Sequence, residues 1–325
     1  MQAFNRPFNE QATFDDIISA YRLLLKRYPD DPALQHYQKI IPAGLSLEAL
    51  VQGILDSPEF MMRSTAEEAL TEVEIDGRFI YARLKDQSVG NEIIRQKSYE
   101  PHVTRILSSI LIKNGGQTFV DIGANIGFFV ILAASIVGAK GTIIAVEPNP
   151  DNVQLILRSV VRSGYKNIHI LPYAASDQET VFEIITGGSN GHVISTKDLL
   201  PHSLFTQSIV LDEHLEKYQK IDIVKIDIEG HEPKAIKGFR KSLRKFTPAI
   251  VTEFHPSALI DFGGNDPEEY LSELFGLHRS ACIILKDGSL KKCWLPKEIM
   301  QFWKEINLVN NTQGLLHLDL LFSSD

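Results

Sequence analysis

Cysteine is scarce in this chain of 325 residues, which contains only Cys282 and Cys293. Their spacing of eleven residues fits neither a disulfide framework nor a metal site, and it favours a reducing cytoplasm. No run approaches the ~18 apolar residues of a membrane span. Residues 1–4 lack the basic segment and apolar core of an export signal. We therefore expect a cytoplasmic protein without a membrane span.

Extended basic clusters are also missing, and the formal net charge is −8. Basic residues gather only in short pieces such as residues 237–245, which argues against nucleic acid as a partner. The hydrophobic fraction of 44% is enough for one large domain and a small one.

Residues 1–63 have the pattern of a small helical module. Thr13 can cap a helix that stops at Pro29, a second helix starts at Asp31, and Ser46 can cap a third. No catalytic residues are apparent in it. We therefore expect an interaction or packing module.

The remaining chain divides into a bridge over residues 64–116 and a large domain over residues 117–325. The bridge has a hairpin pattern around Asp76-Gly77 and a helix pattern after Pro101. From residue 117 onward strand and helix patterns alternate, which predicts parallel strands with right-handed crossovers. Strands are expected near residues 117–122, 142–146, 167–171, 222–227, 248–253, 280–285 and 314–322.

The most informative segment is residues 121–127, Asp-Ile-Gly-Ala-Asn-Ile-Gly, between a strand pattern and a helix pattern. Gly123 and Gly127 have no Cβ to block a ligand, and the free N–H groups near Ala124 and Asn125 can point at it. The next strand ends in Glu147, twenty residues after Gly127. An acid at that spacing can accept hydrogen bonds from both hydroxyls of a ribose.

The loop favours S-adenosylmethionine over a dinucleotide. A dinucleotide loop needs glycines where this chain has Asn125 and Phe128, and Asp121 adds an anion that would repel a diphosphate. S-adenosylmethionine carries a sulfonium and an ammonium and has no phosphate, so an acid there is favourable. A nicotinamide-dependent oxidoreductase or epimerase of sugar metabolism is the alternative, but it would also need a Tyr-x-x-x-Lys pair after the fourth strand.

Four segments in order, residues 119–127, 145–150, 174–177 and 223–232, make the chain resemble the FkbM-type S-adenosylmethionine-dependent methyltransferases. The resemblance is close from residue 99 to residue 254. It implies an α/β, Rossmann-like class I methyltransferase fold with a seven-stranded, mostly parallel, doubly wound sheet. The segments 20–27, 50–51 and 57–60 resemble a phycobilisome-linker-like helical module, a type often fused to enzymes that build bacterial surface polysaccharides.

The spacing and the resemblance together predict the cofactor residues. Glu100 is expected to contact the cofactor or to be buried and structural, and Ser176 and Asp177 are candidates to hold the adenine, or else form a plain turn. The full predicted set is Glu100, Asp121, Gly123, Ala124, Asn125, Gly127, Glu147, Pro148, Ser176, Asp177 and Asp227.

Candidate catalytic residues follow the fourth and fifth strands. A methyl acceptor with a hydroxyl needs a base, and acids or histidines two apart on an extended segment share a face. The predicted set is Asp227, Glu229, His231 and His255, with Glu253 beside them. Asp227 can instead orient the methionine end of the cofactor, Glu229 can tie down a loop, and His231 can cap a helix.

No metal site is predicted, because no fixed ligand spacing is present, although oxygen ligands with histidine suit magnesium or manganese. A glycine-rich stretch at residues 187–192 is expected to be a flexible loop in which His192 can contact the acceptor. The sequence thus predicts an O-methyltransferase for a hydroxyl of a sugar, glycan or related small molecule. A catalytically silent scaffold would have lost acids such as Asp121, Glu147 and Asp227, which are all present.

Overall fold

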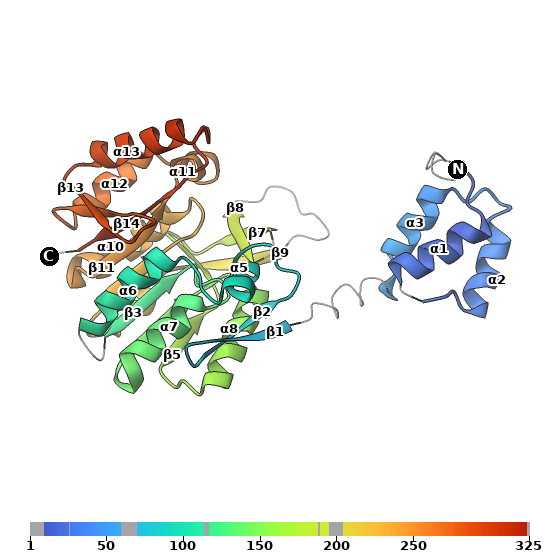
Figure 1. Ribbon diagram of the computed structural model, residues 1–325, viewed down its shortest axis with the longest axis horizontal. Coiled ribbons are helices and arrows are strands. Elements are labelled where there is room, and N and C mark those ends of the chain that lie inside the picture. Colours follow the sequence, from blue (N-terminus) through green and yellow to red (C-terminus); the bar gives the residue numbers. More distant parts are fainter. Residues whose placement is uncertain are drawn as a thin grey trace. The chain divides into compact units, whose positions relative to one another are not determined.

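The computed structural model describes residues 10–25, 27–59, 70–113, 117–187, 189–194 and 204–323. The chain divides into two compact units, Met1–Ala69 and Leu70–Asp325 (Figure 1). The boundary predicted at residues 63 and 64 lies outside the described residues.

The first unit contains three helices at the predicted places, α1 (Phe14–Leu24), α2 (Asp31–Ile40) and α3 (Leu47–Leu55). Thr13 and Asp16 form a capping box on α1, and Ser46 caps α3 by accepting from the N–H of Ala49. A small apolar core joins the helices, with Ile17 and Leu50 almost fully buried. Lys26 and Phe60, which belong to the pattern of the linker-like resemblance, lie outside the described residues.

The second unit is built on an eight-stranded sheet in the order β13-β12-β14-β11-β10-β3-β4-β5. The strands from β11 to β5 run parallel, and β14 runs antiparallel between β11 and β12. All seven expected strands are confirmed, and β13 is an additional edge strand. The bounds are β3 (Thr118–Ile122), β4 (Thr142–Val146), β5 (Ile168–Leu171), β10 (Ile223–Ile226), β11 (Ala249–Phe254), β12 (Ala281–Ile284), β13 (Leu290–Cys293) and β14 (Leu318–Phe322).

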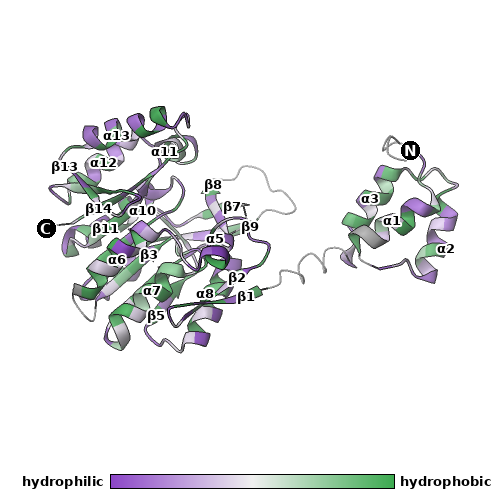
Figure 2. Cartoon of the chain, viewed as in Figure 1, coloured by the Kyte–Doolittle hydropathy of each residue, from purple (hydrophilic) through white to green (hydrophobic). Residues whose placement is uncertain are grey.

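Helices cover both faces of this sheet, and each face has its own apolar core. One core packs against the hairpin β1 (Leu70–Ile75) and β2 (Arg78–Arg83), and against helices α5 (Val89–Gln96), α6 (Pro101–Lys113), α7 (Phe128–Val137) and α8 (Pro150–Ser163). The other packs against α9 (Leu211–Leu215), α10 (Glu232–Phe246), α11 (Pro256–Asp261), α12 (Pro267–Phe275) and α13 (Pro296–Val309). A single 3-10 turn, η1 (Gly138–Lys140), follows α7. Figure 2 shows α7 as a strongly hydrophobic helix, which agrees with its burial between sheet and hairpin.

A second sheet of four strands has the order β6-β9-β7-β8. Its strands are β6 (Ala174–Ser176), β7 (Val181–Gly187), β8 (Asn190–Ile194) and β9 (Leu204–Val210). The prediction of a flexible loop at residues 187–192 is therefore wrong, because β7 and β8 form an antiparallel hairpin there. Gly188 itself lies outside the described residues.

Among the described residues, no helix is both long and apolar enough to cross a membrane.

Candidate functional site

A cavity of about 260 Å³ lies where the parallel strands of the main sheet end. It is lined by the turn after β3, the ends of β4, β10 and β11, the hairpin β7–β8 and the segment before β14. Twelve of the predicted site residues line it: Glu100, Gly123, Ala124, Asn125, Glu147, Pro148, His192, Asp227, Glu229, His231, Glu253 and His255. Asp121, Gly127, Ser176 and Asp177 do not.

The glycine-rich turn is held open by its backbone. Gly123 has φ +87°, and a Cβ at this position would lie 1.9 Å from the carbonyl oxygen of Asp227. Asn125 also has a left-handed backbone, with φ 51°. Only glycine therefore fits at residue 123, and β3 and β10 approach each other closely at the floor of the cavity.

Glu147 is buried and is held by the turn. Its Oε2 accepts a hydrogen bond from the N–H of Asn125 at 2.8 Å, and its Oε1 accepts one from the N–H of Asn149 at 2.9 Å. Burial nevertheless raises the pKa of Glu147 to about 7. The Asn152 Nδ2 also donates to Oε1, over a longer 3.4 Å. Oε2 keeps a further lone pair, so this carboxylate can also accept from ligand hydroxyls.

Asp121 lies behind the turn and is almost completely buried. Neither of its carboxylate oxygens has a hydrogen-bond partner in the described part of the chain. Burial raises the pKa of Asp121 to about 6, although the positive charge of Lys225 opposes that shift. A buried carboxylate without a partner is costly, and because Asp121 does not line the cavity, its charge can favour a cationic ligand only across the turn.

Lys225 and Asp227 form a buried ion pair at the end of β10. The Lys225 Nζ donates to the Asp227 Oδ2 at 2.9 Å, and the lysine side chain is 6% exposed. The charges of Asp227, Asp121 and Glu100 raise the pKa of Lys225 against the effect of burial. Lys225 therefore stays charged and partly neutralises the acids at the bottom of the cavity.

Acids still outnumber lysines on the cavity wall. Five carboxylates, those of Glu100, Glu147, Asp227, Glu229 and Glu253, line it together with Lys225. Burial and then the charge of Asp227 raise the pKa of Glu229 to about 7 and that of Glu253 to about 7. This electrostatic environment favours a cationic ligand.

Glu229 is positioned by an unusual backbone. Its φ is 54°, and the following Gly230 has φ +98°. Glu232 stabilises this turn, because its Oε1 accepts from the N–H groups of Ile228 at 3.0 Å and Gly230 at 3.2 Å. Glu232 thus ties down the loop, a role considered above for Glu229, while the Glu229 side chain lines the cavity.

Two histidines predicted as catalytic line the cavity, and they differ in their hydrogen-bond partners. His231 is buried, its Nε2 lies 3.1 Å from the Ser176 Oγ, and burial lowers its pKa to about 4. The His255 Nδ1 accepts from the N–H of Ala258 at 3.2 Å, so the neutral ring carries its proton on Nε2. Burial and the nearby His317 lower the pKa of His255. His255 can therefore donate a hydrogen bond into the cavity.

The proposed adenine pair lies outside the cavity lining. Ser176 is fully buried against His231, and Asp177 forms an ion pair with Lys237 at 2.6 Å. Their contact with a cofactor stays a prediction. Tyr173, Ala174 and Ala175, which directly precede them, do line the cavity.

His317 and Lys225 are cavity residues that the sequence analysis missed. The His317 Nδ1 lies 3.0 Å from the Glu253 Oε1, and this partner outweighs burial and raises the pKa of His317 to about 9. His317 precedes β14, which runs antiparallel to β11, so the start of β14 reaches the edge where the parallel strands end. For Lys225 the signal was present, since it lies two residues before Asp227 on the same side of β10.

A family model, the methyltransferase FkbM domain, matches residues 121–282. The hexuronic acid methyltransferase AglP of Haloferax volcanii is 31% identical over 153 residues, which is 46% of this chain and 57% of that protein. Protein-L-isoaspartate O-methyltransferase 1 of Archaeoglobus fulgidus is 28% identical over 71 residues, which is 22% of this chain and 33% of that protein.

Among solved structures, the methyltransferase FkbM of Methylobacillus flagellatus KT has a TM-score of 0.42 and 15% identity, covering 85% of this chain and 57% of that one. The chain thus spans little more than half of the length of AglP and of this structure. Residues 121–282 thus match the family model of the methyltransferase FkbM domain, and the sheet order with the cavity at the strand ends agrees with a class I methyltransferase fold.

Proposed function

We propose that the protein is an S-adenosylmethionine-dependent O-methyltransferase. The observation that carries this proposal is the buried Asp121 carboxylate without a partner, next to a cavity lined by five carboxylates. A diphosphate would be repelled there, whereas a ligand with an ammonium and a sulfonium would be stabilised.

The residues present fit this cofactor. The open turn at Gly123 would lie against the ligand, Glu147 would accept from the ribose hydroxyls, and Asp227 would face the ammonium. The buried Asp121 behind the turn would add to the negative charge there. When bound, the cofactor supplies a methyl carbon already activated by the sulfonium. The protein must then hold an acceptor oxygen in line with that carbon and remove its proton.

Glu229 is the best base among the predicted catalytic residues. Its pKa of about 7 lies near neutrality, so the carboxylate can take the proton of a hydroxyl as the oxygen–carbon bond forms and the sulfur keeps the electron pair. Asp227 is already paired with Lys225, and His231 is occupied by Ser176. His255, with its proton on Nε2, would orient the acceptor by donating to it.

A sugar or glycan hydroxyl is the proposed acceptor. The support is the similarity to a hexuronic acid methyltransferase. Cavity-lining groups such as Asn190 and the Nε2 of His255 offer the hydrogen-bonding chemistry that sugar hydroxyls need. For the N-terminal helices we propose docking of a protein partner or self-association, and their linker-like resemblance stays a prediction.

The test is calorimetric titration of the full chain with S-adenosylmethionine, S-adenosylhomocysteine and NAD. Binding of the first two and not of NAD is expected. Binding of NAD alone would overturn the proposal in favour of a nicotinamide-dependent enzyme, and a silent scaffold would bind none of the three. Labelled methyl transfer to sugar nucleotides and lipid-linked oligosaccharides would then identify the acceptor. Glu229→Gln is expected to reduce that transfer about 100-fold or more while leaving cofactor affinity within about twofold.

A further inference from the structure

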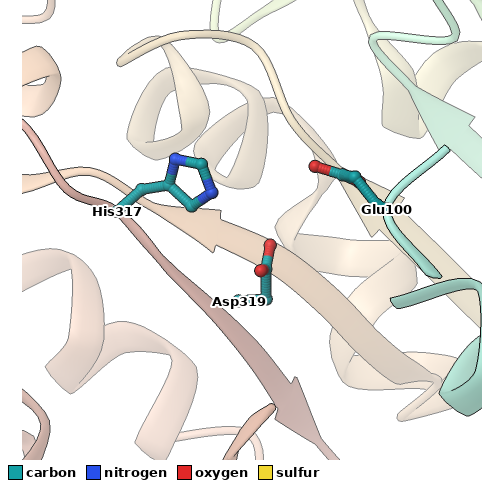
Figure 3. Close-up of side chains that lie close together, drawn as sticks. All are labelled: Glu100, His317 and Asp319. Atoms are coloured by element: carbon teal, nitrogen blue, oxygen red, sulfur yellow. The ribbon is translucent and has the colours of Figure 1, made fainter. Parts of the chain in front are cut away.

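Three potential metal ligands converge beside the cavity: Glu100, His317 and Asp319 (Figure 3). One donor atom from each residue lies within 4.8 Å of the others. Glu100 directly precedes α6, His317 precedes β14, and Asp319 lies within β14. The first two side chains line the cavity, so an ion held here would face its interior.

The His317 ring has the arrangement expected of a metal ligand. Its Nδ1 is 3.0 Å from the Glu253 Oε1, which leaves Nε2 on the ring edge that faces Glu100 and Asp319 (Figure 3). Histidines that bind metals commonly donate their second N–H to a carboxylate, which fixes the tautomer and the ring orientation. The second oxygen of Glu253 is buried and has no hydrogen-bond partner among the described residues.

The Asp319 carboxylate is also held by a neighbouring side chain that is not one of the three potential ligands. Its Oδ2 lies 2.7 Å from the Nε2 of the buried His102, and no hydrogen bond to Oδ1 is found in the described ranges. Two nearby lysines would oppose a metal: Lys286, with its Nζ 3.5 Å from the Asp319 Oδ2, and the buried Lys225, whose charge acts on Glu100. The Lys286 Nζ also lies 3.0 Å from the His102 Nε2. The Lys286 side chain is 71% exposed, so its ammonium can move into solvent at little cost.

Glu100 completes the set with an unengaged carboxylate. Its carbonyl oxygen accepts from the N–H of Thr104, but within the described residues its carboxylate has no hydrogen bond or ion pair. Its backbone has φ 40°, which is uncommon for a residue other than glycine. Such a conformation persists only where the surroundings enforce it. It places the side chain toward His317 and Asp319 (Figure 3).

We propose that Glu100, His317 and Asp319 form a binding site for a divalent cation, Mn²⁺ in preference to Mg²⁺. Two carboxylates and one imidazole are a donor set that suits these ions, and three protein ligands leave coordination positions open toward the cavity. If the proposed function holds, the open positions bind the oxygens of the acceptor and make its hydroxyl easier to deprotonate.

The site is tested by titrating the chelator-treated full chain with Mn²⁺ alone and following free Mn²⁺ by electron paramagnetic resonance. One site with a Kd below about 1 mM is expected, together with weaker competition by Mg²⁺. Glu100→Gln and His317→Ala are each expected to weaken it at least about tenfold, and Glu253→Gln about tenfold through the ring orientation. His169→Ala, at an exposed residue of β5 that does not line the cavity, is the control and should bind Mn²⁺ like the unaltered chain.

Absence of Mn²⁺ binding below about 1 mM, or equal affinity in Glu100→Gln and the unaltered chain, would overturn the proposal. Glu100→Gln removes no hydrogen bond of the described structure, so the test does not depend on how well His317→Ala folds. Cofactor binding is measured separately. If the chain binds S-adenosylmethionine but not Mn²⁺, only the metal site is refuted. If it binds Mn²⁺ but not S-adenosylmethionine, only the proposed function is refuted.

Discussion

Glu147 makes the affinity for ribose-containing ligands depend on pH. Burial places the pKa of this carboxyl at about 7 in the unliganded protein, and only the ionised form can accept from both ribose hydroxyls. About nine tenths of the group is ionised at pH 8 and about one tenth at pH 6. Affinity should therefore rise about tenfold from pH 6 to pH 8, because protonation below pH 7 removes the accepting form.

Methylthioadenosine is the sharpest probe, because it has the ribose and adenine and is uncharged at both pH values. The other acids of the cavity act on a charged ligand through Coulomb interactions, so their effect on this one is small. Calorimetric titration at pH 6 and pH 8 should show the tenfold change for methylthioadenosine and lose it for the 2′,3′-dideoxy analogue, which has neither ribose hydroxyl. Glu147→Gln should bind weakly and equally at both pH values.

The loss of ligand affinity expected at pH 8 when the Glu147 carboxylate is removed can be estimated from its hydrogen bonds. A hydrogen bond to a charged group contributes about 1.5–3 kcal/mol, so Glu147→Ala should weaken binding about 10- to 150-fold. Equal affinity at pH 6 and pH 8, or a Glu147→Gln variant that keeps the full pH dependence, would refute the assignment of this residue to the ribose.

Two further substitutions test the floor of the cavity. Gly123→Ala puts a methyl group 1.9 Å from the Asp227 carbonyl oxygen in a left-handed backbone. Calorimetry should show loss of cofactor binding. Denaturant titration should show a free energy of unfolding that is lower by at least about 1–2 kcal/mol. Unchanged cofactor binding by Gly123→Ala would show that the turn can accommodate a Cβ at residue 123. Lys225→Met leaves buried acids without their cation and should lower the free energy of unfolding by about 3–5 kcal/mol. Lys237→Met, at the exposed pair with Asp177, should lower it by no more than about 1 kcal/mol, and similar losses in the two variants would contradict the role of Lys225.

The parallel half of the sheet could be predicted because each strand combines two local signals. An apolar, β-branched run such as Ile143–Val146 is followed at once by an acid, here Glu147. Parallel strands all end at one edge, so the acids that follow them gather there without knowledge of any loop. This is why most of the predicted site residues line a single cavity.

The hairpin β7–β8 could not be predicted as easily. Its glycines and asparagine at residues 187–191 have the composition of a loop, and they outweighed the alternation of the buried Phe182 and Ile184. That alternation was a usable strand signal. The consequence for the site is direct, since the Asn125 Nδ2 donates to the Asn190 Oδ1 at 2.9 Å and so joins the hairpin to the glycine-rich turn.

The direction of the antiparallel strand β14 explains why residue spacing in the sequence did not predict His317 as a cavity residue. The predicted acids follow the ends of parallel strands, but β14 runs in the opposite direction, so its first residues reach the cavity edge. There Asp319 lies directly opposite Glu253 on β11, and like charges in such a cross-strand pair are destabilising. His317 and His102 each contact one of the two carboxylates. A strand selected for stability alone would avoid this arrangement, and its persistence beside the cavity is the reason to seek function in it.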